Sequence, residues 1–162
     1  MFSDQDRLFM NLAIAEAKIS YSKNEVPVGA VIVRNNEVIG KGYNSVIRNK
    51  DVSSHAEIVA IKNASKFIGN YRLCDTTMYI TLEPCHMCAK AIVDARINQI
   101  IFAAAEPKTG SIISIDNLYD RQTFNHKVLY RHGLLENESS DLLKDFFNAK
   151  LIYKVFFVRI VH

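Results

Sequence analysis

The spacing of hydrophobic and polar residues predicts an alternation of helices and strands along the chain. Ser3 and Asp6 resemble a capping box, in which two side chains satisfy backbone groups at the start of a helix. A first helix is therefore expected to begin there and to end near Tyr21. Within it, four apolar residues recur at helical spacing: Leu8, Leu12, Ala15 and Ile19.

Two runs rich in β-branched residues, 30–33 and 37–39, are joined through Asn35 and Asn36, which is typical of a β-hairpin. Similar patterns predict a helix over 55–64, a strand over 77–82, a helix over 85–94, a buried strand over 99–103, a short strand over 126–130 and a helix over 140–148 capped by Ser139 or Ser140. Such an order implies an α/β fold with helices on both faces of a sheet. No linker or repeat interrupts it, so residues 1–162 are expected to form one domain.

The composition is that of an ordinary globular protein. Of the 162 residues, 49% are apolar and 23% charged, which argues against disorder. No apolar run reaches the roughly 18 to 20 residues that a membrane-spanning helix needs. Acidic residues stand near the N-terminus where a signal peptide would carry basic ones, so a cytoplasmic location is expected. A disulfide framework is not expected, because two of the three cysteines, Cys85 and Cys88, are three positions apart.

The formal net charge of +3 comes from the last part of the chain, because residues 121–162 hold seven basic and four acidic residues. Residues 1–120 hold 13 of each kind. So small a surplus is not a nucleic-acid-binding tail, and a solvated surface explains it equally well. Charge alone therefore selects no function class.

The strongest chemical signal is a His-Ala-Glu motif followed later by a Pro-Cys-His-Met-Cys motif. Two cysteines three positions apart in the first turn of a helix project to the same side, as two ligands of one ion must. Zinc binds Cys and His in tetrahedral geometry, and a catalytic zinc keeps one position for water. The ligand set His55, Cys85 and Cys88 would leave that position open, and Glu57 beside it could take a proton from the bound water.

Each motif alone has a simpler explanation. A Cys-x-x-Cys pair is often a redox pair or half of a structural zinc site, and a single His-x-Glu is close to noise. His86 could be a fourth ligand that closes the site, but its place between the two cysteines points it elsewhere on the helix. Cys74 has no evident partner and is expected to be a small buried apolar residue.

Taken together, the two motifs match the signature of the zinc nucleobase deaminases. Over about residues 6–147, the chain more specifically resembles the bacterial tRNA-specific adenosine deaminases. The segments that carry this narrower resemblance are residues 25–30, 70–73, 81–85, 108–110, 125–126 and 145–147.

The resemblance implies the cytidine deaminase-like fold, a three-layer α/β/α sandwich with a mixed five-stranded sheet. It implies one Zn²⁺ per subunit, held by His55, Cys85 and Cys88, with water or hydroxide as the fourth ligand. The implied reaction converts adenosine to inosine at the wobble position of a tRNA anticodon, usually of an arginine tRNA. Zinc-activated hydroxide attacks C6 of adenine, Glu57 shuttles protons and ammonia leaves. The implied partners are a tRNA anticodon stem-loop and a second subunit, which makes a homodimer.

Contacts with the RNA follow from the resemblance as well. It assigns Asn44 to the target nucleoside, Val28, Gly29 and Ala30 to the wall under the base, Lys108 to a phosphate and Phe147 to a stacked anticodon base. Asn44 is also typical of a turn at a strand end, and Gly29 of a bulge. Phe146 and Phe147 could pack in the core, although a regular helix points one of the pair away from it. Glu83 is a further candidate that would support the site through backbone contacts.

The chain departs from the family pattern at two places. Glu106 stands where the family often has Asp, so its carboxylate is one methylene further from the backbone. Residues 151–162 include nine apolar residues, where the family commonly has a polar, basic extension. That segment is expected to be a strand or a packed apolar tail. Lys144 and Lys150 are then the nearer candidates for RNA contacts.

Two rival functions stay open. One is deamination of a free base or nucleoside such as cytosine, cytidine or guanine, which the zinc signature alone does not exclude. Segments 70–73 and 145–147 favour the tRNA branch over that rival. The other is a non-catalytic RNA-binding module stabilised by zinc, and Glu57 argues against it, because a structural site has no use for a carboxylate beside an open position.

Overall fold

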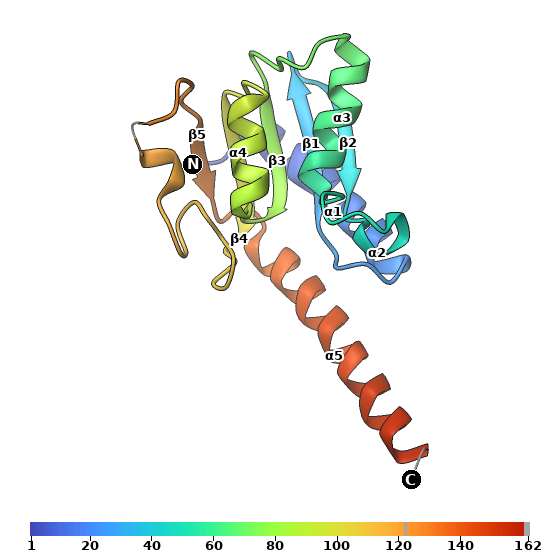
Figure 1. The fold of residues 1–162 in the computed structure, drawn as a ribbon. Helices are drawn as coiled ribbons and strands as arrows, with labels where there is room; N and C mark the ends of the chain where they lie inside the picture. The colour runs from blue at the N-terminus through green and yellow to red at the C-terminus, as the bar shows by residue number, and fades with distance from the viewer. Residues whose placement is uncertain (122, 161–162) are drawn as a thin grey trace.

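A five-stranded sheet lies at the centre of the computed structural model, which describes residues 1–121 and 123–160, with side chains through Ile152. The strands are β1 (Gly29–Arg34), β2 (Glu37–Tyr43), β3 (Thr77–Leu82), β4 (Gln99–Ala104) and β5 (Leu129–His132). Their order across the sheet is β2-β1-β3-β4-β5 (Figure 1). β1 runs antiparallel to β2 and β3, whereas β3, β4 and β5 are parallel, so the sheet is mixed as expected.

Helices cover both faces of this sheet and confirm the expected three-layer α/β/α sandwich (Figure 1). They are α1 (Asp4–Ser22), α2 (Val46–Asn49), α3 (Ala56–Ile68), α4 (His86–Asp94) and α5 (Glu136–Ile160), and a 3₁₀ turn, η1, covers Leu118–Asp120. The core under α3 and α4 contains Ile32 and Ile80, and the core under α1 contains Val31 and Tyr79. Successive strand residues face opposite sides, so each inner strand contributes to both cores.

The first helix and the hairpin form where the sequence predicts them. Ser3 and Asp6 make a complete capping box ahead of α1. The four apolar residues at helical spacing are the exposed ones, however: Leu8, Leu12, Ala15 and Ile19. Phe9 and Met10 lie on the buried face. Asn35 and Asn36 join β1 to β2 with φ of 51° and 60°, the left-handed conformation that a two-residue hairpin turn of type I′ requires.

The last helix is longer than predicted. It begins at Glu136, so Ser139 and Ser140 lie inside it, and the Ser139 hydroxyl donates to the carbonyl of Thr81 rather than capping the helix. The expectation of a strand at 151–162 is wrong, because α5 continues to Ile160; residues 161 and 162 lie outside the described part. A helix already formed adds residues at little cost, so the apolar run extends it. Its C-terminal half projects away from the sheet (Figure 1).

The last strand begins three residues later than predicted and ends two residues later, at His132. His126 is held outside the sheet, its ring Nε2 lying 2.7 Å from the carbonyl oxygen of Ile97. Pairing begins at Leu129, whose N–H donates to the carbonyl of Asn98. In the described ranges, the helices are all too short or too polar to cross a membrane.

The packing of α3 on β2 depends on two glycines. A Cβ added to Gly42 would lie 2.3 Å from the carbonyl oxygen of Ala56, and one added to Gly40 would lie 2.6 Å from that of Ala60. The helix and the strand therefore approach each other more closely than any larger residue allows. Because His55 immediately precedes α3, this packing also sets the position of the histidine.

Gly42→Ala is expected to lower the free energy of unfolding by about 3 kcal/mol, the upper end of ordinary overpacking, because the added methyl meets backbone atoms. Gly69→Ala is the matched control. Gly69 has φ +76° and open space around it. An alanine there meets no atom, and its only cost is the left-handed backbone conformation, about 1 kcal/mol. Urea unfolding at one protein concentration measures both. Equal losses in the two variants would contradict the close-packing argument.

Candidate active site

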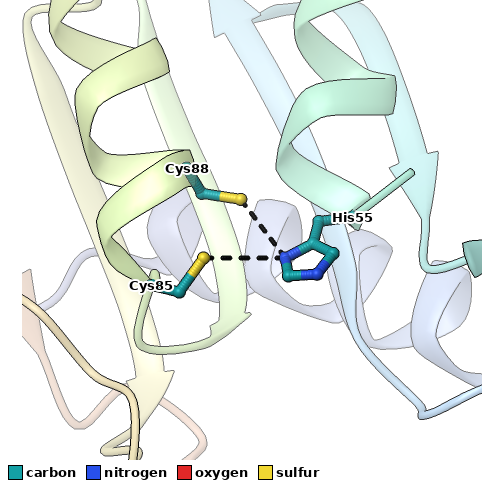
Figure 2. Close-up of side chains that lie close together, drawn as sticks. All are labelled: His55, Cys85 and Cys88. Carbon is teal, nitrogen blue, oxygen red and sulfur yellow. Dashed lines mark hydrogen bonds between the residues drawn. The ribbon is translucent and has the colours of Figure 1, made fainter. Parts of the chain in front are cut away.

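The side chains of His55, Cys85 and Cys88 converge at the N-terminal ends of α3 and α4 (Figure 2). His55 is the residue before α3 and Cys85 the residue before α4, with Cys88 one turn into that helix. The Nδ1 atom of His55 lies 3.7 Å from the Cys85 Sγ and 3.5 Å from the Cys88 Sγ. All candidate ligand atoms lie within 4.8 Å of one another. The structure thus brings together the three residues that the motifs single out.

This donor set fits zinc. Two sulfurs and one imidazole nitrogen are the ligands that zinc favours, and three protein ligands are typical of a site with an open fourth position. The hydrogen bond from Cys88 lowers the pKa of the Cys85 thiol to about 4, with His55 adding to the effect and burial opposing it. That hydrogen bond, together with burial, raises the pKa of Cys88. One sulfur is therefore readily available as the thiolate that binds metal.

Glu57 lies in the first turn of α3 and is almost completely buried, with 4% of its surface exposed. Burial raises its pKa to about 7, and the Cys85 thiolate adds to this, while hydrogen bonds and His55 oppose it. It lines a cavity of about 220 Å³ that also contains His55 and Cys85. The other residues of the cavity wall are Val26, Val28, Asn44, Leu82, Glu83, Glu106 and Thr109.

Of the predicted substrate contacts, Asn44 and Val28 line the cavity, and Gly29 and Ala30 do not. The missing side chain of Gly29 faces α1, because a Cβ there would lie 2.0 Å from the carbonyl oxygen of Ala13. Ala30 is fully buried in the core under α3 and α4. The close approach that Gly29 permits is therefore made by a helix.

Lys108 and Phe147 both lie outside the cavity. Lys108 is exposed, and its backbone N–H donates to the Glu106 carboxylate. Phe146 is buried and packs edge-on against Tyr21, with ring centroids 5.5 Å apart, whereas Phe147 is 50% exposed. One of the two phenylalanines thus points away from the core, as a regular helix requires.

Two other predictions concern a possible fourth ligand and a thiol outside this group. His86 points away from the converging group, its Nε2 lying 3.3 Å from the Asp116 carboxylate. Cys74 is exposed, so the expectation of a buried cysteine is wrong. It lies in the loop before β3, where the Arg34 guanidinium binds its carbonyl oxygen at the surface.

Sequence reasoning did not single out Val26, Leu82 and Thr109 as cavity residues. Each lies within a segment that carries the family resemblance, namely 25–30, 81–85 or 108–110. Membership of those segments was the available signal, but apolar residues and one threonine have no chemistry that marks them individually.

A larger groove of about 720 Å³ runs beside β2 and α3. It is lined by residues such as Lys41, Asn63 and Phe67 and shares none with the cavity at the thiols. Two of the three candidate metal ligands, His55 and Cys85, line the smaller cavity together with Glu57, so this cavity is the candidate active site.

Comparison of the sequence and the fold with known proteins identifies the general class to which the chain belongs. The family model described as MafB19-like deaminase matches residues 3–151. The fold and the His/Cys/Cys group agree with that match, so the chain belongs to the deaminases. A structure of a guanine deaminase from Nitrosomonas europaea has a TM-score of 0.71 at 18% identity, over 90% of this chain and 85% of its own, which shows the shared fold.

Closer relatives place the chain within the family of tRNA-specific adenosine deaminases, which are enzymes. The tRNA-specific adenosine deaminase of Buchnera aphidicola subsp. Baizongia pistaciae is 47% identical over 147 residues, 91% of either chain. That of Aquifex aeolicus is 45% identical over 86% of this chain and 91% of its own. A structure from a study of A-to-I editing by tRNA:A34 deaminases at the wobble position has a TM-score of 0.81 and is 40% identical. The match covers 84% of this chain and 99% of that one.

Cys88→Ala is expected to abolish zinc binding, because it removes one of three converging ligands, and to lower the thermal midpoint since metal binding is coupled to folding. Metal analysis of the purified variant measures the zinc content directly. Cys74→Ala is the matched control: this cysteine is exposed and outside the group, so zinc content should not change. A full equivalent of zinc in Cys88→Ala would exclude Cys88 as a ligand.

Proposed function

We propose that this chain is a zinc-dependent hydrolase that deaminates adenosine to inosine at the wobble position of a tRNA anticodon, with an arginine tRNA as substrate. The observation that carries the proposal is the buried Glu57 carboxylate in the same cavity as the converging His55 and Cys85. Membership of the tRNA-specific adenosine deaminase family supports the choice of substrate.

His55, Cys85 and Cys88 would hold one zinc ion per subunit. When bound, zinc supplies the activated water that hydrolytic deamination at C6 of adenine needs. Glu57 does the proton transfers. Its carboxylate accepts a proton from the attacking water and returns protons to the nitrogens of the base, so that the exocyclic amine leaves as ammonia. Water and adenosine are consumed and inosine and ammonia are formed, with no other reactant.

The cavity volume supports the recognition of a single base. About 220 Å³ lies below the roughly 300 Å³ at which pockets for drug-sized ligands begin, so one base extruded from the loop fits while its neighbours stay outside. Asn44 and Val28 contact the target nucleoside. Gly29 and Ala30 follow Val28 in the chain and support, from behind, the part of the cavity wall that lies under the base. Lys108 meets a phosphate, and the exposed ring of Phe147 stacks on an anticodon base.

The same family resemblance supports a homodimer acting in the cytoplasm, with residues 1–162 forming one domain in each subunit. The partner of the dimer is the anticodon stem-loop of a tRNA.

Incubation with an anticodon stem-loop that carries adenosine at the wobble position is expected to yield inosine, measured by nuclease digestion and chromatography. Free adenosine, cytidine and guanine should not react, since they lack the neighbouring nucleotides that Lys108 and Phe147 contact. A stem-loop with adenosine only at another loop position is the matched control. Turnover of a free base or nucleoside with none in the RNA would overturn the proposal in favour of a small-molecule deaminase.

Glu57→Gln is expected to lower kcat on the stem-loop by at least about 10²–10⁴-fold, because the amide has the shape of the carboxylate but cannot accept a proton. Zinc content and stem-loop affinity should stay at the level of the unchanged protein, because Glu57 is not among the three converging ligand residues. Loss of zinc from this variant, or substantial remaining turnover, would contradict the role assigned to Glu57.

A further inference from the structure

Glu83 is a buried carboxylate for which the reaction has no direct use. It follows β3 and is 3% exposed. Its Oε1 accepts hydrogen bonds from the backbone N–H groups of Ile112, Ile113 and Ser114, at 3.0, 2.8 and 3.0 Å. Its Oε2 accepts from the N–H of Glu106 at 3.0 Å and from the Ser114 hydroxyl. Five donors thus surround one carboxylate.

All five donors belong to one segment, residues 106–114, which follows β4 and is called the 106–114 loop below. Glu106 and Thr109 of this loop form part of the cavity wall. The carboxylate holds both ends of the loop, at Glu106 and at 112–114, and so closes it. The N–H and the hydroxyl of Ser111 also donate to the carbonyl of Pro84, which ties the middle of the loop to the residues after β3. Hydrogen bonds to a charged acceptor are about twice as strong as such neutral ones, so the five bonds to Glu83 form the larger part of the link.

Gly110 at the middle of the loop faces the same carboxylate. A Cβ at that position would lie 2.3 Å from both the Cδ and the Oε2 of Glu83, and 2.6 Å from the carbonyl oxygen of Glu106. The loop therefore wraps so tightly around the carboxylate that only glycine fits. A second observation, independent of the hydrogen bonds, thus indicates that the loop conformation is built around Glu83.

We infer that Glu83 is a positioning residue of the substrate cavity. Its carboxylate fixes the conformation of the 106–114 loop, and the loop in turn places Glu106 and Thr109 in the cavity wall that the entering base contacts. The inference rests on the proposed deamination of an RNA base. Glu83 acts on the loop and not on the metal ligands, so its loss affects substrate binding before it affects zinc.

Glu83→Gln tests this selectively. The new side chain has one acceptor oxygen and one donor nitrogen. Its oxygen should face the three N–H groups of 112–114, so its nitrogen faces the N–H of Glu106, which then has no acceptor. The Glu106 end of the loop is released while the side-chain volume is kept. KM for the stem-loop should rise about tenfold or more, with kcat within about twofold, because the loop contributes to binding in the ground state and the transition state alike.

Gly110→Ala should reproduce that effect from the other side of the contact, since the methyl group displaces the carboxylate. The double variant should be less than additive in KM, because both changes break one arrangement. Glu16→Gln is the control: Glu16 is another buried carboxylate, with Lys41 at 3.7 Å, but it lies on α1 and makes no contact with the loop. Its KM should not change.

Two readouts besides activity decide the matter. Amide hydrogen exchange at the released end of the loop, residues 106–110, should accelerate at least about tenfold in Glu83→Gln while 86–94 stays protected, and zinc content should stay at one equivalent. Unchanged exchange or unchanged KM would overturn the inference, and so would loss of zinc, which would make Glu83 a support of Cys85 instead. If the unchanged protein fails to edit the stem-loop, the proposed function falls, and the exchange experiment still reports on the loop.

Discussion

Glycine and alanine set the distance between α3 and β2, and that distance determines where the metal-binding group can form. Gly40 and Gly42 on the strand face Ala60 and Ala56 on the helix, with no room for a side chain between them. His55 directly precedes this tightly packed helix, so its ring has little freedom to move away from the thiols of α4. A larger residue at either glycine would shift a whole helix and the histidine with it. The chemistry of the site therefore depends on a packing contact that contains no reactive atom.

Local signals in the sequence predict much of the fold, and they fail where distant contacts decide. The Asn35-Asn36 turn and the capping box are settled within a few residues, so both appear as predicted. The buried face of α1 is not, because apolar residues occur on two of its faces and only packing against β1 and β3 selects one. The long extension of α5 likewise follows from helix continuity, which short-range apolar patterning does not distinguish from a strand.

The same division holds for the candidate site. Residue type and spacing suffice to predict His55 and the two cysteines as a group, because ligand chemistry restricts both. Spacing does not reveal that the missing side chain of Gly29 faces α1, since the direction of a strand residue depends on register across the whole sheet. Nor does it give the partners of Glu83, which lie 23 to 31 positions further along the chain. Reactive residues are thus easier to predict than the residues that hold them in place.

Two buried carboxylates of this site have different roles because their surroundings differ. Burial dominates at Glu57 and raises its pKa to about 7. At Glu83 burial acts in the same direction, but hydrogen bonds from Ser114 and from backbone N–H groups outweigh it and hold the pKa below its ordinary value. A carboxylate surrounded by five donors stays ionised and has no free lone pair with which to exchange a proton with a substrate. Glu83 is therefore suited to fixing a loop, and proton transfer is left to Glu57, where burial outweighs the hydrogen bonds.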